Sequence, residues 1–197
     1  MSIETIAVLG AGQMGSGIAQ IAATSGYNVI IRDIKQEFCD KGVNGIKAGL
    51  DKQVAKGKTT QEAADAIMAR ISTTVELEGV APADFVIEAA PEILSLKHDT
   101  FVQLGEICKP DAILCTNTSS MSIGEITKDC KNPERCIGMH FFFPVYAMKL
   151  VEMIRSCYTS DATVAAVREV AEKMGKKPVE CKTDTPGFIV NRCLFAF

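Results

Sequence analysis

The sequence predicts an α/β protein built on a doubly wound, mainly parallel sheet. Up to Thr116, apolar strand patterns alternate with amphipathic helix patterns, an order that gives a parallel sheet covered by helices on both faces. The first apolar run, Ile6–Leu9, leads into a glycine-rich turn and then a helix pattern. After Thr116 the alternation changes, and two strand patterns follow each other closely enough to form an antiparallel hairpin extension of the sheet.

The expected elements follow from apolar periodicity and from turn residues. We expect strands near residues 4–9, 28–33, 71–75, 84–89 and 112–116, and helices near 13–25, 36–56, 60–70 and 92–108. Further on, Arg135–Phe143 and Met148–Ile154 have the pattern of two strands separated by 144–147. A helix near 160–175 ends at Gly175, a short strand covers 178–181, and Asp184–Gly187 forms a turn.

The C-terminal run Phe188–Phe197 has the pattern of the apolar start of a helix. It has no polar face and no capping residue, and a natural domain seldom ends on an uncovered hydrophobic run. We therefore expect one domain over residues 1–184 and, over 185–197, a linker with the first turns of a truncated second domain. We also expect this run to cause self-association or docking on a neighbour.

The segment between the first strand and first helix, Gly10-Ala11-Gly12-Gln13-Met14-Gly15, has the spacing G-x-G-x-x-G. Gly10 allows the tight turn, Gly12 lets a pyrophosphate approach the backbone, and Gly15 lets the helix pack close to the strand. The free amides of the helix N-terminus then face the phosphate charge. This context predicts a Rossmann-type dinucleotide site. The alternative is a glycine-rich turn without a ligand.

An acidic residue ends the second strand, where such a site requires one. Asp33 would accept hydrogen bonds from the adenosine ribose and repel a 2′-phosphate, which favours NAD over NADP. Its neighbour Arg32 weakens that preference.

Composition excludes several classes of function. Apolar residues make up 47% and charged residues 23% of the 197 residues, and the net charge is −3, so neither a nucleic acid nor an anionic membrane is an expected partner. No apolar run reaches the ~18 residues of a transmembrane helix. Because Met1–Glu4 leads straight into the first strand, we expect no signal peptide. Eight scattered cysteines without C-x-x-C, and only two histidines, predict no metal site but reduced thiols in a cytoplasmic protein.

The segment Lys41–Lys58 is an amphipathic helix pattern with a basic face of five lysines, at 41, 47, 52, 56 and 58. Two interpretations stay open. The lysines are either a solvated surface or a landing surface for an anionic substrate tail.

Polar residues with possible chemical roles follow later strands. Asn117–Ser120 come directly after Ala112–Thr116, at the sheet edge where open α/β sheets bind ligands; the plainer interpretation is a turn with an N-cap serine. His140 ends a strand, and Glu152 lies 12 residues further on, inside an apolar strand. Since a buried carboxylate needs a partner, we expect the two to face each other across the hairpin. Such a pair fixes the imidazole tautomer and stabilises its charged form, as a general base requires.

The chain closely resembles the L-3-hydroxyacyl-CoA dehydrogenases, in particular the bacterial 3-hydroxybutyryl-CoA type, over about Ile3–Phe197. The resemblance rests on motifs spread along the chain: Val8–Ala19, Val86–Ala89, Asn117–Ser120, Gly138–Phe142, Met148–Glu152 and Thr185–Arg192. It implies oxidation of a short-chain (S)-3-hydroxyacyl-CoA, or the reverse reduction of the 3-oxo compound.

The resemblance also implies residue roles. His140 would be the general base, Glu152 would orient it, and Ser119 and Asn191 would bind the reacting oxygens of the acyl-CoA. NAD would be held by Gly10, Gly12, Gln13, Met14, Gly15, Asp33, Glu92, Lys97 and Asn117. Lys52 would join Ser119 and Asn191 on the CoA side. Members of the family carry an all-helical C-terminal domain that forms a homo-oligomer in the full-length protein.

Two departures from the family pattern keep an alternative open. Phe143 stands where the family usually has Asn, so a hydrogen bond worth ~1 kcal/mol is lost beside the base, and the chain ends where the helical domain would begin. The alternative is a catalytically incompetent NAD-binding domain or fragment. A different β-hydroxyacid dehydrogenase, with a catalytic lysine, is disfavoured because no matching motif is present.

Overall fold

A computed structural model describes residues 2–195 of the chain. The strands are β1 (Thr5–Leu9), β2 (Asn28–Arg32), β3 (Ile71–Thr74), β4 (Phe85–Glu88), β5 (Ile113–Thr116), β6 (Cys136–Phe141), β7 (Leu150–Ile154) and β8 (Lys177–Cys181). The α-helices are α1 (Gln13–Thr24), α2 (Gln36–Ala55), α3 (Gln61–Met68), α4 (Leu94–Ile107), α5 (Ile123–Thr127), α6 (Asp161–Lys173) and α7 (Val190–Phe195). Two 3₁₀ turns cover Leu77–Val80 and Pro133–Arg135.

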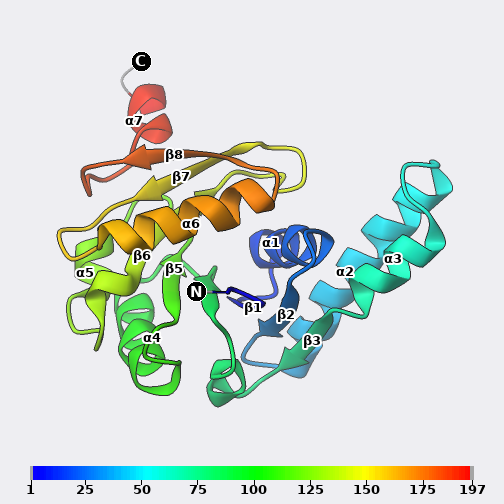
Figure 1. Cartoon of the computed structure of the whole chain (residues 1–197), viewed down its shortest axis with the longest axis horizontal. Coiled ribbons are helices and arrows are strands. Elements are labelled where there is room, and N and C mark those ends of the chain that lie inside the picture. Colours follow the sequence, from blue (N-terminus) through cyan, green and yellow to red (C-terminus); the bar gives the residue numbers. More distant parts are fainter. Residues whose placement is uncertain (1, 196–197) are drawn as a thin grey trace.

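All eight strands form one sheet in the order β3-β2-β1-β4-β5-β6-β7-β8. Strands β1 to β6 are parallel, β7 is antiparallel to β6, and β8 is parallel to β7. The predicted doubly wound sheet with a hairpin extension is therefore confirmed (Figure 1). The strand order reverses between β1 and β4, and a crevice for ligands is expected at the carboxyl ends of the strands on either side of such a point.

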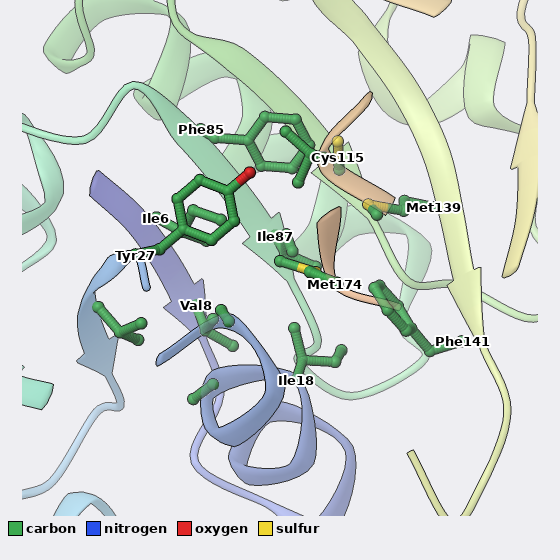
Figure 2. Packing of buried hydrophobic residues seen from close by; sticks show 14 of the residues in the cluster. Ile6, Val8, Ile18, Tyr27, Phe85, Ile87, Cys115, Met139, Phe141 and Met174 are labelled. Carbon is green, nitrogen blue, oxygen red and sulfur yellow. The ribbon is translucent and has the colours of Figure 1, made fainter. Parts of the chain in front are cut away.

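Helices cover both faces of the sheet. One apolar cluster packs α1, α2 and α6 against the strands through Ile18, Ile46 and Val167, and Figure 2 shows Tyr27 and Phe85 in its interior. The second cluster packs α4 and α5 on the opposite face. Because both faces are covered, the central strands are mainly apolar, with polar residues such as Glu88 and Thr116 at their carboxyl ends.

Helix starts follow from short polar side chains. Thr60, Ser122 and Ser160 each accept a hydrogen bond from the backbone N–H three residues further on, at the starts of α3, α5 and α6. Helices α1, α2 and α4 start without a side-chain cap, and the residue that precedes α1 is Gly12. No helix within residues 2–195 is long and apolar enough to cross a membrane.

The structure corrects the expectations in three places. Strand β6 ends at Phe141, so the β6–β7 loop covers 142–149 and is longer than expected. Helix α5 was not predicted, because five residues are too few for a visible period. The C-terminal run is not wholly uncovered: Phe188 is only 3% exposed and packs on Ile123, whereas Leu194 is 67% exposed. Residues 196–197 of that run lie outside the described residues.

Candidate active site

The glycine turn joins β1 to α1 with little spare room. Gly10 has φ +101°, and a Cβ there would lie 2.7 Å from the carbonyl oxygen of Ala89. A Cβ on Gly15 would lie 1.8 Å from the Gly10 carbonyl oxygen, so helix and turn touch. A Cβ on Gly12, in contrast, would meet nothing within 4 Å. The turn is therefore closed towards the sheet and open at Gly12, as the approach of a pyrophosphate requires.

The N-terminus of α1 is suited to an anion. Its first amides, at Gln13 and Met14, have no acceptor within the helix, and the first turn contains no acidic side chain. The helix dipole therefore acts on this open space without a carboxylate in the first turn of the helix itself.

Asp33 lies beside this turn, as predicted. Its Oδ2 accepts a hydrogen bond of 2.7 Å from the amide of Ala11, and its Oδ1 accepts one from Ile34. A pocket of about 540 Å³ is lined by Gly12, Gln13, Asp33 and Lys41. Arg32 donates through Nε to the carbonyl of Val75, so its guanidinium is engaged at the end of β3. These residues fit the adenosine half of a dinucleotide.

A buried ion pair lies under the carboxyl ends of β4 and β5. Lys97 is 1% exposed, and its Nζ lies 2.7 Å from Oε1 of the fully buried Glu88 and 3.3 Å from Oε2 of Glu92. The Glu88 carboxylate also accepts from the Ala90 amide and the Thr116 hydroxyl. With every group paired, the network holds the β4–α4 loop rigid.

Glu92 connects this network to Ser119. Its Oε1 accepts hydrogen bonds from the Thr118 hydroxyl and from both the amide and the hydroxyl of Ser119. Burial raises the pKa of Glu92, but the hydrogen bonds from Ser119 and the charge of Lys97 outweigh burial and hold that pKa below its usual value. Glu92 is therefore an anion that fixes Ser119.

His140 and Glu152 face each other across the antiparallel pair, as predicted. They are register partners on β6 and β7, and Nδ1 of His140 lies 2.7 Å from Oε2 of the 1%-exposed Glu152. The other oxygen of Glu152 accepts the amides of Ile189 at 3.0 Å and Val190 at 2.8 Å. Burial raises the pKa of Glu152, but the His140 hydrogen bond and these amides outweigh it, so that its pKa lies below the usual value.

An ionised Glu152 accepts the Nδ1 proton of His140, which leaves Nε2 as the ring nitrogen available to a ligand. The ring itself is held by aromatic neighbours. Phe142 lies 4.5 Å and Phe188 5.8 Å from the imidazole, centroid to centroid.

Of the four predicted catalytic residues, Glu152 is buried behind His140, and Ser119, His140 and Asn191 line one pocket of about 400 Å³. It is lined by Met14, Ala89, Glu92, Asn117, Ser119, His140, Phe141, Phe142, Phe143 and Asn191. Asn191 donates through Nδ2 to the Ser119 carbonyl, and Asn117 accepts the Phe141 amide through Oδ1. The structure thus brings together Ser119, His140 and Asn191, which are widely separated in the sequence.

Lys52 is not among the residues that line either pocket; it lies exposed in the last turn of α2. On the same helix Lys47 pairs with Asp51 at 2.8 Å, as expected for a solvated face, whereas Lys41 lines the pocket beside Asp33. A role for Lys52 on the CoA side stays a prediction.

The sequence did not identify three residues that support the site, namely Glu88, Asp184 and Phe188. Glu88 ends an apolar strand. The argument that a buried carboxylate needs a partner, which identified Glu152, therefore identifies Glu88 equally well. Asp184 and Phe188 gave no such signal, because their partners lie far away in the sequence. Within residues 2–195 no group of three or more His, Cys, Asp or Glu side chains is arranged to hold a metal.

The fold and the pockets together define an NAD-binding domain of a dehydrogenase. The chain belongs to the 3-hydroxyacyl-CoA dehydrogenase family, because the model of that family's NAD-binding domain matches residues 5–185.

Relatives of the chain carry related names. It is 49% identical to a probable 3-hydroxybutyryl-CoA dehydrogenase of Deinococcus radiodurans, over 95% of this chain and 66% of that protein. It is 44% identical to the 3-hydroxyadipyl-CoA dehydrogenase of Escherichia coli, over 98% of this chain and 40% of that protein. The solved structure of (S)-3-hydroxybutyryl-CoA dehydrogenase from Ralstonia eutropha superposes with a TM-score of 0.95 at 41% identity, over 98% of this chain and 68% of that one. The chain thus spans between about two fifths and two thirds of the length of these relatives.

Proposed function

We propose that the protein transfers a hydride between NAD and C3 of a short-chain (S)-3-hydroxyacyl-CoA, the 3-hydroxybutyryl-CoA/acetoacetyl-CoA pair being the first candidate. The observation that carries the proposal is that His140, paired with the buried Glu152, lines one pocket with Ser119 and Asn191. The names of the relatives support the acyl-CoA class.

Each residue of the pocket has a physical task in this reaction. NAD, when bound, supplies the hydride acceptor. His140 takes the proton of the C3 hydroxyl through Nε2 as the C3 hydride departs, and Glu152 stabilises the imidazolium that forms. Ser119 and Asn191 donate hydrogen bonds to the reacting oxygens and so hold the carbon in line for transfer. Lys97 and Glu92 keep Ser119 and the β4–α4 loop in place.

The cofactor assignments follow the same geometry. The Gly10–Gly15 turn and the amides of Gln13 and Met14 would hold the pyrophosphate, Asp33 would hold the adenosine ribose, and Glu92 and Asn117 would lie on the nicotinamide side. The ammonium of Lys97 is already paired with Glu88 and Glu92, so Lys97 would support the cofactor site indirectly, by holding Glu92 in place.

The test is NADH oxidation that depends on acetoacetyl-CoA, with NADH binding followed by fluorescence in the same buffer. Wild-type turnover that is lost in His140→Gln, with NADH affinity retained, is the expected result. Full turnover of that variant would refute the base assignment.

A second candidate is an NAD-binding domain without catalysis. Phe143, 61% exposed, lines the pocket where the family usually has Asn. NADH binding without turnover, both in wild type and in Phe143→Asn, favours this candidate, whereas recovery of turnover in Phe143→Asn locates the defect in that one side chain.

We further propose a cytoplasmic location and assembly into a homo-oligomer of the full-length form. All eight cysteines lie in the described part of the chain and are free thiols, as a reducing compartment maintains. Light scattering over a concentration series tests the assembly, and a monomer at all concentrations would refute it.

A further inference from the structure

The residues from Asp184 to Asn191, here called the arm, follow β8, include the first two residues of α7 and reach the catalytic pair. Asp184 begins the arm and bonds to residues about sixty positions earlier. Its Oδ2 accepts the Ser122 hydroxyl and the Gly124 amide, both at 2.7 Å, and its Oδ1 accepts the Ile123 amide at 2.9 Å. Both carboxylate oxygens therefore hold the arm on the first residues of α5.

The arm then turns sharply. Gly187 has φ +80° and Phe188 φ +49°, the left-handed region that a residue with a bulky side chain rarely occupies. Phe188 is buried against Ile123 and Ile154, and its ring lies edge-on to His140. Such a conformation persists only where the surroundings enforce it, and here the Asp184 anchor and this packing do so.

The residues past the turn act directly on the site. The amides of Ile189 and Val190 bond to Oε1 of Glu152, and Asn191 bonds to the Ser119 carbonyl. Glu152 in turn holds His140 through its other oxygen. The position of the imidazole therefore depends on backbone amides whose own position depends on the arm.

We propose that Asp184 is a positioning residue for the catalytic pair. Its carboxylate fixes the arm on α5 and so places the two amides that orient Glu152, without itself touching the pocket. The kinetic consequence rests on the function proposed above, whereas the structural consequence does not.

The chain offers a clean spectroscopic probe, because it contains only two histidines. His140 donates its Nδ1 proton to Glu152, and such a buried proton gives a low-field NMR signal that His140→Gln assigns by its loss. The other histidine, His98, contacts Asp99 and Asp129 at the surface of α4. Its ring signals should not respond to changes at Glu152, so they serve as the internal reference.

The test compares Asp184→Ala with Asp84→Ala. Asp84 is the matched control because it also accepts three hydrogen bonds, from two amides and Lys109, but lies at the amino end of β4. In Asp184→Ala we expect the low-field signal to broaden or disappear, kcat to fall by up to about 100-fold, and NADH affinity to stay unchanged. Asp84→Ala should keep the signal and kcat.

An unchanged low-field signal in Asp184→Ala would refute the proposal that Asp184 positions the catalytic pair. An equal loss of that signal in Asp84→Ala would refute it too, because the loss would then reflect general destabilisation. If Asp184→Ala does not fold, Asp184→Asn is measured instead; it keeps the size and one accepting oxygen, and it should weaken the signal partially. If neither wild type nor Phe143→Asn shows turnover, the proposed function fails, and the NMR comparison alone still decides the role of Asp184.

Discussion

Replacing Glu152 by Gln removes one charge from the site and little else. Glutamine has nearly the same shape, so its amide oxygen can still accept the Ile189 and Val190 amides. Its NH₂ group then faces Nδ1 of His140, where the carboxylate lay at 2.7 Å. The imidazole loses its anionic acceptor, and the tautomer that leaves Nε2 as the base is no longer favoured.

The magnitude follows from the lost interaction. A hydrogen bond to a charged group contributes about 1.5–3 kcal/mol, and since the imidazolium forms only during the reaction, this free energy is lost from the transition state. At 1.36 kcal/mol for each factor of ten, kcat should fall by roughly 10- to 160-fold. Glu152 does not line the described pockets, so NADH affinity should hardly change.

The assay is steady-state NADH oxidation with acetoacetyl-CoA, alongside NADH titration. Glu180→Gln is the control, because Glu180 on β8 also forms ion pairs, with Arg155 and with Arg168 of α6, but does not line the pocket of His140. A kcat within twofold of wild type for Glu152→Gln, or an equal loss in Glu180→Gln, would refute the reasoning.

The pH dependence of stability is a second readout of the same pair. The folded-state pKa of Glu152 lies below its unfolded value near 4.5, so its ionised form stabilises the fold above that pH. This contribution is lost as the pH falls through the folded pKa. Wild type should therefore lose more stability than Glu152→Gln between neutral and acid pH, which urea unfolding at several pH values measures.

Three further predictions concern the cofactor side of the site. Gly15→Ala places a Cβ 1.8 Å from the Gly10 carbonyl oxygen and should lower stability by about 1–3 kcal/mol, whereas Gly45→Ala meets nothing within 4 Å; thermal unfolding compares the two. Lys97→Met leaves Glu88 as an unpaired buried charge and should cost about 3–5 kcal/mol in urea unfolding, with partial recovery in Lys97→Met/Glu88→Gln. Asp33→Ser should raise NADPH affinity relative to NADH by about tenfold, or ~1.4 kcal/mol, in fluorescence titrations; an unchanged ratio would contradict the assignment of Asp33 to the ribose.

Much of the fold and of the site could be predicted because both depend on short-range patterns. Apolar alternation predicted the strands, and the glycine spacing with Asp33 predicted the turn that we propose for the cofactor. The twelve-residue separation of His140 and Glu152 across a hairpin was enough to pair them, and the structure confirms the pairing at 2.7 Å. Local periodicity and one turn are sufficient for such contacts.

The rest depends on contacts that no local pattern encodes. Asp184 looks like an ordinary turn residue, yet its three hydrogen bonds go to α5, a helix too short to predict. Phe188 looked uncovered in the sequence because the apolar residues that bury it, Ile123 and Ile154, come from other elements. The roles of Asp184 and Phe188 become visible only when the fold has brought α5, β7 and the arm together.

Substitutions near the proposed cofactor turn and substitutions near the His140–Glu152 pair should have different effects. The cofactor turn is fixed by residues of β1, α1 and β2 that contact one another directly, so changes there should alter NADH affinity. The His140–Glu152 pair is fixed from the other end of the sheet, by β6, β7 and the arm (Figure 1). Since the two sets of supports share no hydrogen bond, distant changes in them should combine additively in free energy. A strong coupling between Gly15→Ala and Asp184→Ala in a double-mutant cycle would show that cofactor turn and catalytic pair move as one unit.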